Sequence, residues 1–169
     1  TTHDELAVGA PGTNSAAGAV AIYASDLSTL GATPLTLTQT LTQASAPSSS
    51  AEPGDEFGAA LAIADFQVLS AQSDLVVGAP GEDGDAGAVS FFTGGTTLLN
   101  GLVTHKQAAF IGGSQAANDR FGESLGFGHL NASGEGISND QRNANMFRAI
   151  DLAVGAPGDA PLVGFGVSG

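Results

Sequence analysis

The sequence contains no cysteine and no tryptophan, and only four of its 169 residues are lysine or arginine. The absence of cysteine excludes disulfides, thiolate metal sites and thiol nucleophiles. Seventeen acidic residues give a net charge of −13, so nucleic acids and anionic membranes are unsuitable partners and cations are the natural counter-charge. No apolar run approaches the roughly 18 residues of a membrane span, so we expect no insertion into a membrane.

One short segment occurs three times along the chain. It reads DELAVGAPG at 4–12, DLVVGAPG at 74–81 and DLAVGAPG at 151–158. Each copy is an apolar run typical of a β-strand, and its proline ends the hydrogen-bonding ladder. Such a repeat predicts a fold built from several copies of one supersecondary unit.

Further strands surround each copy of this segment. GAVAIY at 18–23, GAVSFF at 87–92 and, less faithfully, GFGV at 164–167 follow it, each after a hairpin loop. Upstream of the second and third copies lie DEFGAALAIAD at 55–65 and DRFGESLGFGH at 119–129. In both, a Phe-Gly pair opens a strand of small residues, which allow neighbouring backbones to approach closely.

A fourth strand completes each unit. LTLTQTLT at 35–42 alternates strictly with period two, which predicts one buried and one exposed face, and HKQAAFIGG at 105–113 takes the matching place. No segment has a persuasive helical period, although 139–150 has room for a helical turn, and 45–54 has the composition of a flexible connector. The sequence therefore predicts an all-β protein whose unit is four short antiparallel strands.

Phe-Gly followed by Gly-Ala-Pro occurs twice in the same order. The pairs are Phe57-Gly58 with Gly78-Ala79-Pro80 and Phe121-Gly122 with Gly155-Ala156-Pro157, and a further Gly9-Ala10-Pro11 opens the chain. In these residues the chain resembles, over nearly its whole length, the FG-GAP repeat of integrin α-subunit β-propellers and their bacterial relatives. The resemblance implies propeller blades of four antiparallel strands, packed face to face around an axis.

The repeats divide the chain into an incomplete ring of two to three blades. We expect a partial first blade with its connector at 1–54, a second blade at 55–118, and a partial third blade at 119–169 with a long inserted loop at 131–150. A blade cannot bury both of its apolar faces without neighbours. The chain is therefore expected to be a fragment of a longer propeller, or alternatively a subunit completed by further copies of itself.

The resemblance also implies Ca²⁺, bound by oxygen side chains at alternating positions of the loop between the first two strands of a blade. In the second blade this loop keeps Asp65 and Asp74 but has Gln67 and Leu69 at the inner positions. The alternative there is that the two aspartates cap a hairpin. In the third blade an ordinary polar loop is likewise the alternative. The candidate calcium ligands of the third blade are Asn131, Ser133, Glu135 and Asp151.

An acidic cluster of Glu82, Asp83 and Asp85 lies in the loop after the second Gly-Ala-Pro. Asp83 and Gly84 are first of all good turn residues. The cluster is also the candidate for a charge-dependent contact with a ligand, because the resemblance places this loop on the rim opposite the calcium loops. The three histidines lie on different elements and match no catalytic triad or metalloprotease motif, so we expect no enzyme.

These observations lead to an expected function. The chain is expected to be a non-enzymatic β-propeller segment, extracellular or at the cell surface, that acts in adhesion or protein interaction and is stabilised by Ca²⁺ in some blades. Its partner would be another protein or further copies of itself. The alternatives are a structural subunit that assembles into a ring or filament through blade faces and strand edges, and an accessory propeller of a larger secreted enzyme. The adhesion role follows from the fold resemblance and not from site chemistry.

Overall fold

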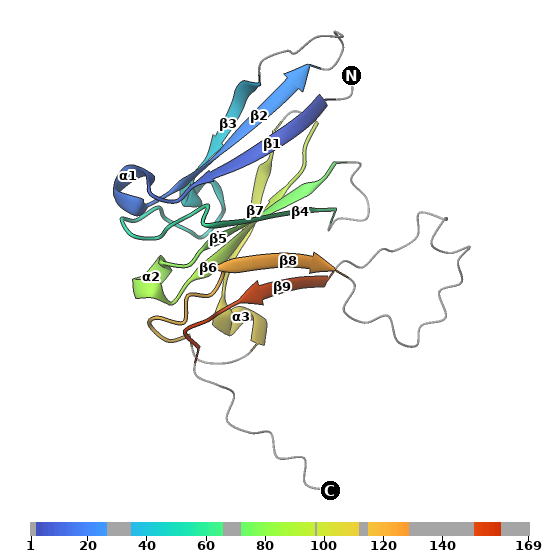
Figure 1. The fold of residues 1–169 in the computed structure, drawn as a ribbon. Coiled ribbons are helices and arrows are strands. Elements are labelled where there is room, and N and C mark those ends of the chain that lie inside the picture. Colours follow the sequence, from blue (N-terminus) through green and yellow to red (C-terminus); the bar gives the residue numbers. More distant parts are fainter. Residues whose placement is uncertain are drawn as a thin grey trace, which may run out of the picture.

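The structure, a computed structural model, describes residues 3–26, 35–65, 72–96, 98–111, 115–128 and 151–159. These residues form three antiparallel sheets that follow one another along the chain (Figure 1). The prediction of an all-β protein is confirmed.

The strands of each sheet are neighbours in sequence order. The first sheet contains β1 (His3–Ala10), β2 (Ala19–Asp26) and β3 (Thr36–Leu41). The second contains β4 (Ala60–Ala64), β5 (Asp74–Ala79), β6 (Ala88–Thr93) and β7 (Asn100–Lys106). The third contains β8 (Ser124–Gly128) and β9 (Asp151–Gly155). The short helical segments are α1 (Thr13–Ala16), η1 (Gln43–Ser45), α2 (Glu82–Asp85) and α3 (Gln107–Ile111).

The second sheet has the four-stranded form expected for one unit, but its last strand is not where the sequence placed it. The expected strand at 105–113 is wrong: β7 ends at Lys106 and the next five residues form α3. The alternating segment before Lys106 supplies Val103, which lies opposite Phe91 of β6. Gln107 and the two alanines after it favour a helix over a strand.

One other expectation needs correction, and two fall on residues outside the described ranges. The strand at 35–42 is confirmed as β3, but Leu37 is 53% exposed, so its expected buried face is present only at Leu41. The segment at 45–54, which has the composition of a flexible connector, is held by its neighbours, because Ala46 is buried and the Gly54 amide donates a hydrogen bond to the Ser15 carbonyl. The strand expected at 164–167 and the helical turn expected at 139–150 lie outside the described residues.

Strand β5 is buried along its whole length because both faces of the second sheet are covered. Leu75, Val77 and Ala79 belong to an apolar cluster shared with the first sheet. Val76, whose side chain points to the opposite face, belongs to a second cluster shared with the third sheet. The second sheet therefore lies between the other two, as Figure 1 shows.

The same joint connects each sheet to the next. The Phe57 amide donates to the Ala17 carbonyl at 3.2 Å, and the Phe121 amide donates to the Ala86 carbonyl at 3.1 Å. Each acceptor lies in the turn that follows the Gly-Ala-Pro segment of the preceding sheet. Both phenylalanine side chains are buried in the clusters between sheets. The Phe-Gly pair is therefore the element that docks one sheet on the one before it.

Glycine is required at this joint because backbones meet there. A Cβ placed on Gly78 would lie 2.0 Å from the carbonyl oxygen of Gly122, in the next sheet. The equivalent Gly9 would place a Cβ 2.1 Å from the carbonyl oxygen of Gly58. Real Cβ atoms do not approach an oxygen so closely, so the first glycine of Gly-Ala-Pro is selected by the distance between sheets.

Replacement of Gly78 tests this joint. We expect Gly78→Ala to lower the free energy of unfolding by about 1–3 kcal/mol, because the added methyl group forces the backbones apart. Gly126→Ala is the matched control, since a Cβ on this strand glycine meets no atom within 4 Å, and its effect should stay below about 0.5 kcal/mol. Denaturant unfolding followed by circular dichroism measures both; equal losses would contradict the close-approach explanation.

Candidate functional site

The loop that carries the acidic cluster is a tight left-handed turn. Asp83, Gly84 and Asp85 have φ values of 52°, 70° and 65°, a region that aspartate and glycine enter more easily than most residues. Asn14 and Ser15 of α1 adopt the same backbone in the first sheet. This turn joins the antiparallel strands β5 and β6, so the hairpin expected here is confirmed.

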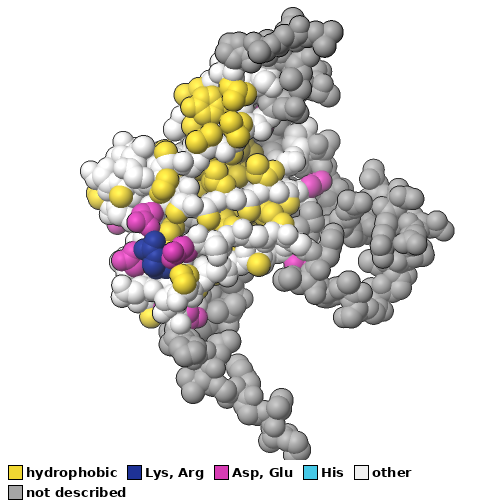
Figure 2. Space-filling model, viewed as in Figure 1, with side chains coloured by type: hydrophobic (Ala, Val, Ile, Leu, Met, Phe, Trp, Pro, Cys, Tyr) yellow, Lys and Arg dark blue, Asp and Glu magenta, His cyan; other side chains and the backbone are white. Residues whose placement is uncertain are grey.

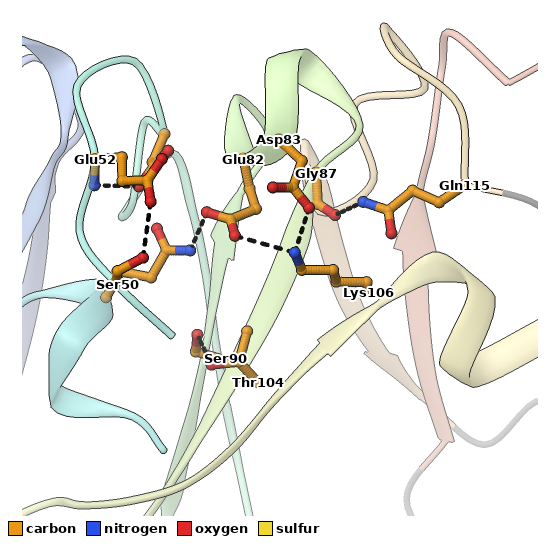
Figure 3. A network of polar contacts seen from close by, with 11 residues as sticks. Ser50, Glu52, Glu82, Asp83, Gly87, Ser90, Thr104, Lys106 and Gln115 are labelled. Atoms are coloured by element: carbon orange, nitrogen blue, oxygen red, sulfur yellow. Dashed lines mark hydrogen bonds and ion pairs between the residues drawn. The ribbon is translucent and has the colours of Figure 1, made fainter. Parts of the chain in front are cut away.

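Lys106 neutralises the first part of the cluster. Its Nζ lies 3.4 Å from the Glu82 carboxylate and donates a hydrogen bond to the Asp83 carboxylate (Figure 3). The hydrogen bond to Asp83 is the main reason why the pKa of Lys106 is raised above its ordinary value. The last strand of the second sheet therefore supplies the counter-charge for the turn of the same sheet.

Arg120 neutralises the second part and joins two units. Its guanidinium donates to Glu56 at 2.8 Å, to Asp85 at 2.9 Å and to Glu123 at 2.6 Å. The bonds to Glu56 and then Glu123 raise its pKa further, so the charge is permanent. Figure 2 shows basic atoms surrounded by acidic side chains at this edge of the molecule. Arg120 follows the Asp of the third unit's Asp-x-Phe-Gly, so the ion network spans the joint.

A buried aspartate opens each Asp-x-Phe-Gly segment. Asp55 is 3% exposed, and its carboxylate accepts the Glu52 amide at 2.6 Å. Asp119, also 3% exposed, accepts the Ala116 amide at 2.7 Å. Burial is the largest effect on Asp55 and raises its pKa, with the nearby Glu82 adding to the rise and the Glu52 bond opposing it. The sequence analysis did not single out these two residues, although the repeated Asp before Phe-Gly was a visible signal.

A second pair of repeated polar contacts crosses the joints. Gln43 donates from Nε2 to the Glu82 carboxylate at 2.5 Å, and Gln107 donates from Nε2 to the Asp159 carboxylate at 2.7 Å. Both glutamines are buried; Gln43 follows β3 and Gln107 follows β7. Both acids directly follow a Gly-Ala-Pro-Gly segment. The sequence analysis missed this contact, although Gln-Ala occurs at 43–44 and again at 107–108.

On this edge of the molecule the acidic side chains outnumber the basic ones. We call it the acidic rim, and define it as Glu56, Glu82, Asp83, Asp85, Glu123, Lys106 and Arg120. Five carboxylates share two cations, so the rim keeps a negative charge. The side chains of Asp83 and Asp85 are 54% and 46% exposed, whereas that of Glu82 is 10% exposed. Asp83 and Asp85 are therefore accessible to a partner, whereas Glu82 accepts the hydrogen bond from Gln43 between the sheets.

The two calcium ligands expected in the second unit lie at the ends of neighbouring strands β4 and β5. Asp65 is exposed after the end of β4, and Asp74 is 1% exposed at the start of β5. The Asp74 carboxylate accepts the Gly94 amide at 2.9 Å, so it holds the chain where β6 ends. No group of three acidic, histidine or cysteine side chains suited to a metal ion occurs within the described ranges. The Gly94 contact gives Asp74 a structural role, and calcium binding by Asp65 and Asp74 stays a prediction.

Of the calcium ligands expected in the third unit, only one lies within the described residues. Asp151 is half-buried at the start of β9, opposite Gly128 of β8. Asn131, Ser133 and Glu135 lie outside the described residues.

The sequence matches no model of a known protein family and no curated protein. The resemblance to the FG-GAP repeat therefore rests on the repeated residues themselves. None of the helices within the described ranges has the length and apolar character needed to cross a lipid bilayer.

Substitution of Asp74 separates a structural from a metal-binding role. We expect Asp74→Ala to cost about 1–3 kcal/mol of stability, because the half-buried Gly94 amide loses an acceptor, whereas Asp74→Asn keeps an oxygen and costs less. Stability measured by denaturant unfolding should be the same with calcium and with a chelator. If the chelator destabilised the natural chain but not Asp74→Asn, the residue would be a calcium ligand.

Asp55 should impose a pH dependence on stability. Its folded-state pKa lies above the ordinary value of 3.8, so the native state binds more protons than the unfolded state between the two pKa values, and this contribution to stability falls as the pH rises through that window. Asp55→Asn should remove the decline while preserving the Glu52 contact. Thermal melts from pH 3 upward check the sign; a steeper decline in the variant would refute it.

Proposed function

We propose that the chain is part of a non-enzymatic β-propeller of the FG-GAP type and acts as an adhesion or protein-interaction module, outside the cell or at its surface. The support for the architecture is the joint, which occurs twice with the same backbone hydrogen bonds and the same close glycine contacts. A joint that repeats in this way allows further sheets to be added with constant geometry, which is the structural basis of a propeller.

The acidic rim carries the functional part of the proposal. Turns α1 and α2 project from the same edge of their sheets (Figure 1), so successive units would present successive turns to one partner. Because five carboxylates share two cations at this edge, the partner that fits is a protein surface rich in lysine and arginine. Calcium binding at Asp65 and Asp74 is a separate prediction that the Asp74 substitutions test.

A basic peptide probes the rim directly. We expect a lysine-rich peptide to bind the natural chain at low ionic strength and to dissociate as salt is added, because exposed charges are screened. Asp83→Asn should weaken the binding by about two- to fivefold, the effect of one exposed ion pair, as measured by calorimetric titration.

Glu5→Gln is the matched control, because Glu5 is an exposed acid on β1, away from the rim. It should leave the affinity for the peptide unchanged. Binding that is equally sensitive to both substitutions, or no binding at low salt, would refute a specific role for the rim.

A further inference from the structure

Arg120 holds the turn of the preceding sheet by two separate bonds. Its backbone amide donates to the Asp85 carbonyl at 2.8 Å, and Nη1 of its guanidinium donates to the Asp85 carboxylate at 2.9 Å. Nη2 donates at 2.8 Å to the carboxylate of Glu56, which also belongs to the second unit. We call these contacts of Arg120 with Asp85 and Glu56 the clasp. The clasp joins the third unit to the second by charge as well as by packing.

The joint between the first and second sheets has the same backbone bond without the charges. The Glu56 amide donates to the Ala16 carbonyl at 2.8 Å, as the Arg120 amide does to the Asp85 carbonyl. Ala16 has no carboxylate, and an acid, Glu56, stands where a clasp of the first joint would need a cation. The two joints therefore share one backbone geometry but differ in the ionic contact at these positions.

The apolar packing behind the clasp is less complete than that of the first joint. Among the described residues, Leu75 and Val77 face the first sheet and are 2% and 0% exposed. Leu152 and Val154, the aligned residues of β9, are only partly buried against the second sheet. The clasp therefore contributes a larger share of the docking than an ion pair would at the first joint.

The clasp lies within reach of solvent and of a partner. The Arg120 side chain is 32% exposed, and the side chains of Glu56 and Asp85 are 37% and 46% exposed. Salt screens ion pairs at such positions. A cation of a partner that approaches Asp85 or Glu56 also approaches the guanidinium, which is always charged and repels it. Closure of the clasp and occupation of the acidic rim by a basic partner are therefore opposed.

We propose that Arg120 couples the acidic rim to the second joint: a basic protein partner competes with Arg120 for Asp85 and Glu56, and its binding loosens the docking of the third sheet on the second. The inference rests on the proposed function, because the partner is the surface rich in lysine and arginine described there. The coupling is reciprocal, so a weaker joint strengthens the binding of the partner. Arg120 thus occupies part of the rim until a partner takes its place.

Hydrogen exchange of single amides, followed by NMR, tests the clasp without any partner. The Arg120 and Phe121 amides report the second joint, because their acceptors lie in the turn after β5. The Glu56 and Phe57 amides report the first joint in the same molecule. Raising sodium chloride from about 20 to about 500 mM should speed exchange at Arg120 and Phe121 by about two- to tenfold but not at Glu56 and Phe57. Equal changes at both joints would overturn the clasp.

Two matched substitutions separate the clasp from a general effect of charge. Glu56→Gln removes a carboxylate that Arg120 contacts across the joint, whereas Glu123→Gln removes one that it contacts within its own unit, at 2.6 Å. Both remove one negative charge, and both leave the bond between Arg120 and Asp85 in place. Glu56→Gln should speed exchange at Phe121 by about two- to fivefold at low salt, and Glu123→Gln should not. Equal acceleration in the two variants would refute a contact that acts across the joint. Circular dichroism establishes that both variants fold.

The lysine-rich peptide tests the coupling itself. At low salt and a saturating concentration, it should speed exchange at Arg120 and Phe121 of the natural chain by about two- to tenfold. Lys106→Met is the control for net charge, because the ion pairs of Lys106 are with Glu82 and Asp83 of its own sheet. This variant should bind the peptide more tightly and keep the peptide's effect on Phe121. Bound peptide that slows exchange at Phe121, or leaves it unchanged, would overturn the coupling.

The two proposals can fail separately. Absence of peptide binding at low salt would refute the proposed function and the competition at the rim, and the salt response of Phe121 would then decide whether Arg120 closes the joint. Peptide binding without a change at Phe121 would leave the proposed function in place and overturn the coupling.

Discussion

The distance between neighbouring sheets is set where their backbones touch, at the glycine that precedes Ala-Pro and the glycine that follows Phe. Because a carbonyl oxygen of one sheet occupies the space that a Cβ of the other would need, no side chain except hydrogen fits at this point. The phenylalanine beside it then reaches the apolar cluster and the Phe amide finds its acceptor. Core packing, turn geometry and the polar contacts of the rim all depend on this spacing.

The polar groups of the joints follow from the same approach. The glycine before each acid donates its amide to the aspartate carbonyl of its own unit, Gly81 to Asp55 at 3.0 Å and Gly158 to Asp119 at 3.1 Å. Glu82 and Asp159 then accept hydrogen bonds from buried glutamines of the preceding sheet. Arg120 likewise meets carboxylates from the unit before its own because its own amide donates to the Asp85 carbonyl at 2.8 Å. Arg120 is thus placed where the second and third sheets meet. Charge and packing act together at the joint, and neither could be moved without the other.

Local sequence patterns predicted the strands that carry the repeat. The bounds of the other strands and the exposure of their side chains depend on contacts with segments distant in the sequence. The apolar run of DLVVGAPG indicated a strand, and its burial on both faces depends on the sheets on either side. The position of β7 could not be predicted, because it depends on the pairing with β6, in which Val103 lies opposite Phe91. Leu37 is exposed although it belongs to an alternating segment. Alternation decides which side chains share a face, but only a neighbouring sheet can bury that face.

Of the candidate site, the turn and its acids were predictable, but the partners of those acids were not. Gln43, Lys106 and Arg120 are distant in sequence from the carboxylates they bind, and only the stacking of sheets brings them together. The same holds for Asp74, whose bond to Gly94 depends on where β6 ends.

The second sheet is covered on both faces, whereas the third has a strand in which glycine alternates with apolar residues. In a stack where each layer contacts only its neighbours, stability is approximately the sum of the stability of each layer and of the interfaces between neighbours. The protein is therefore graded along its length. We therefore expect the middle layer to open last and the glycine-rich layer to be lost without melting the joint between the first two.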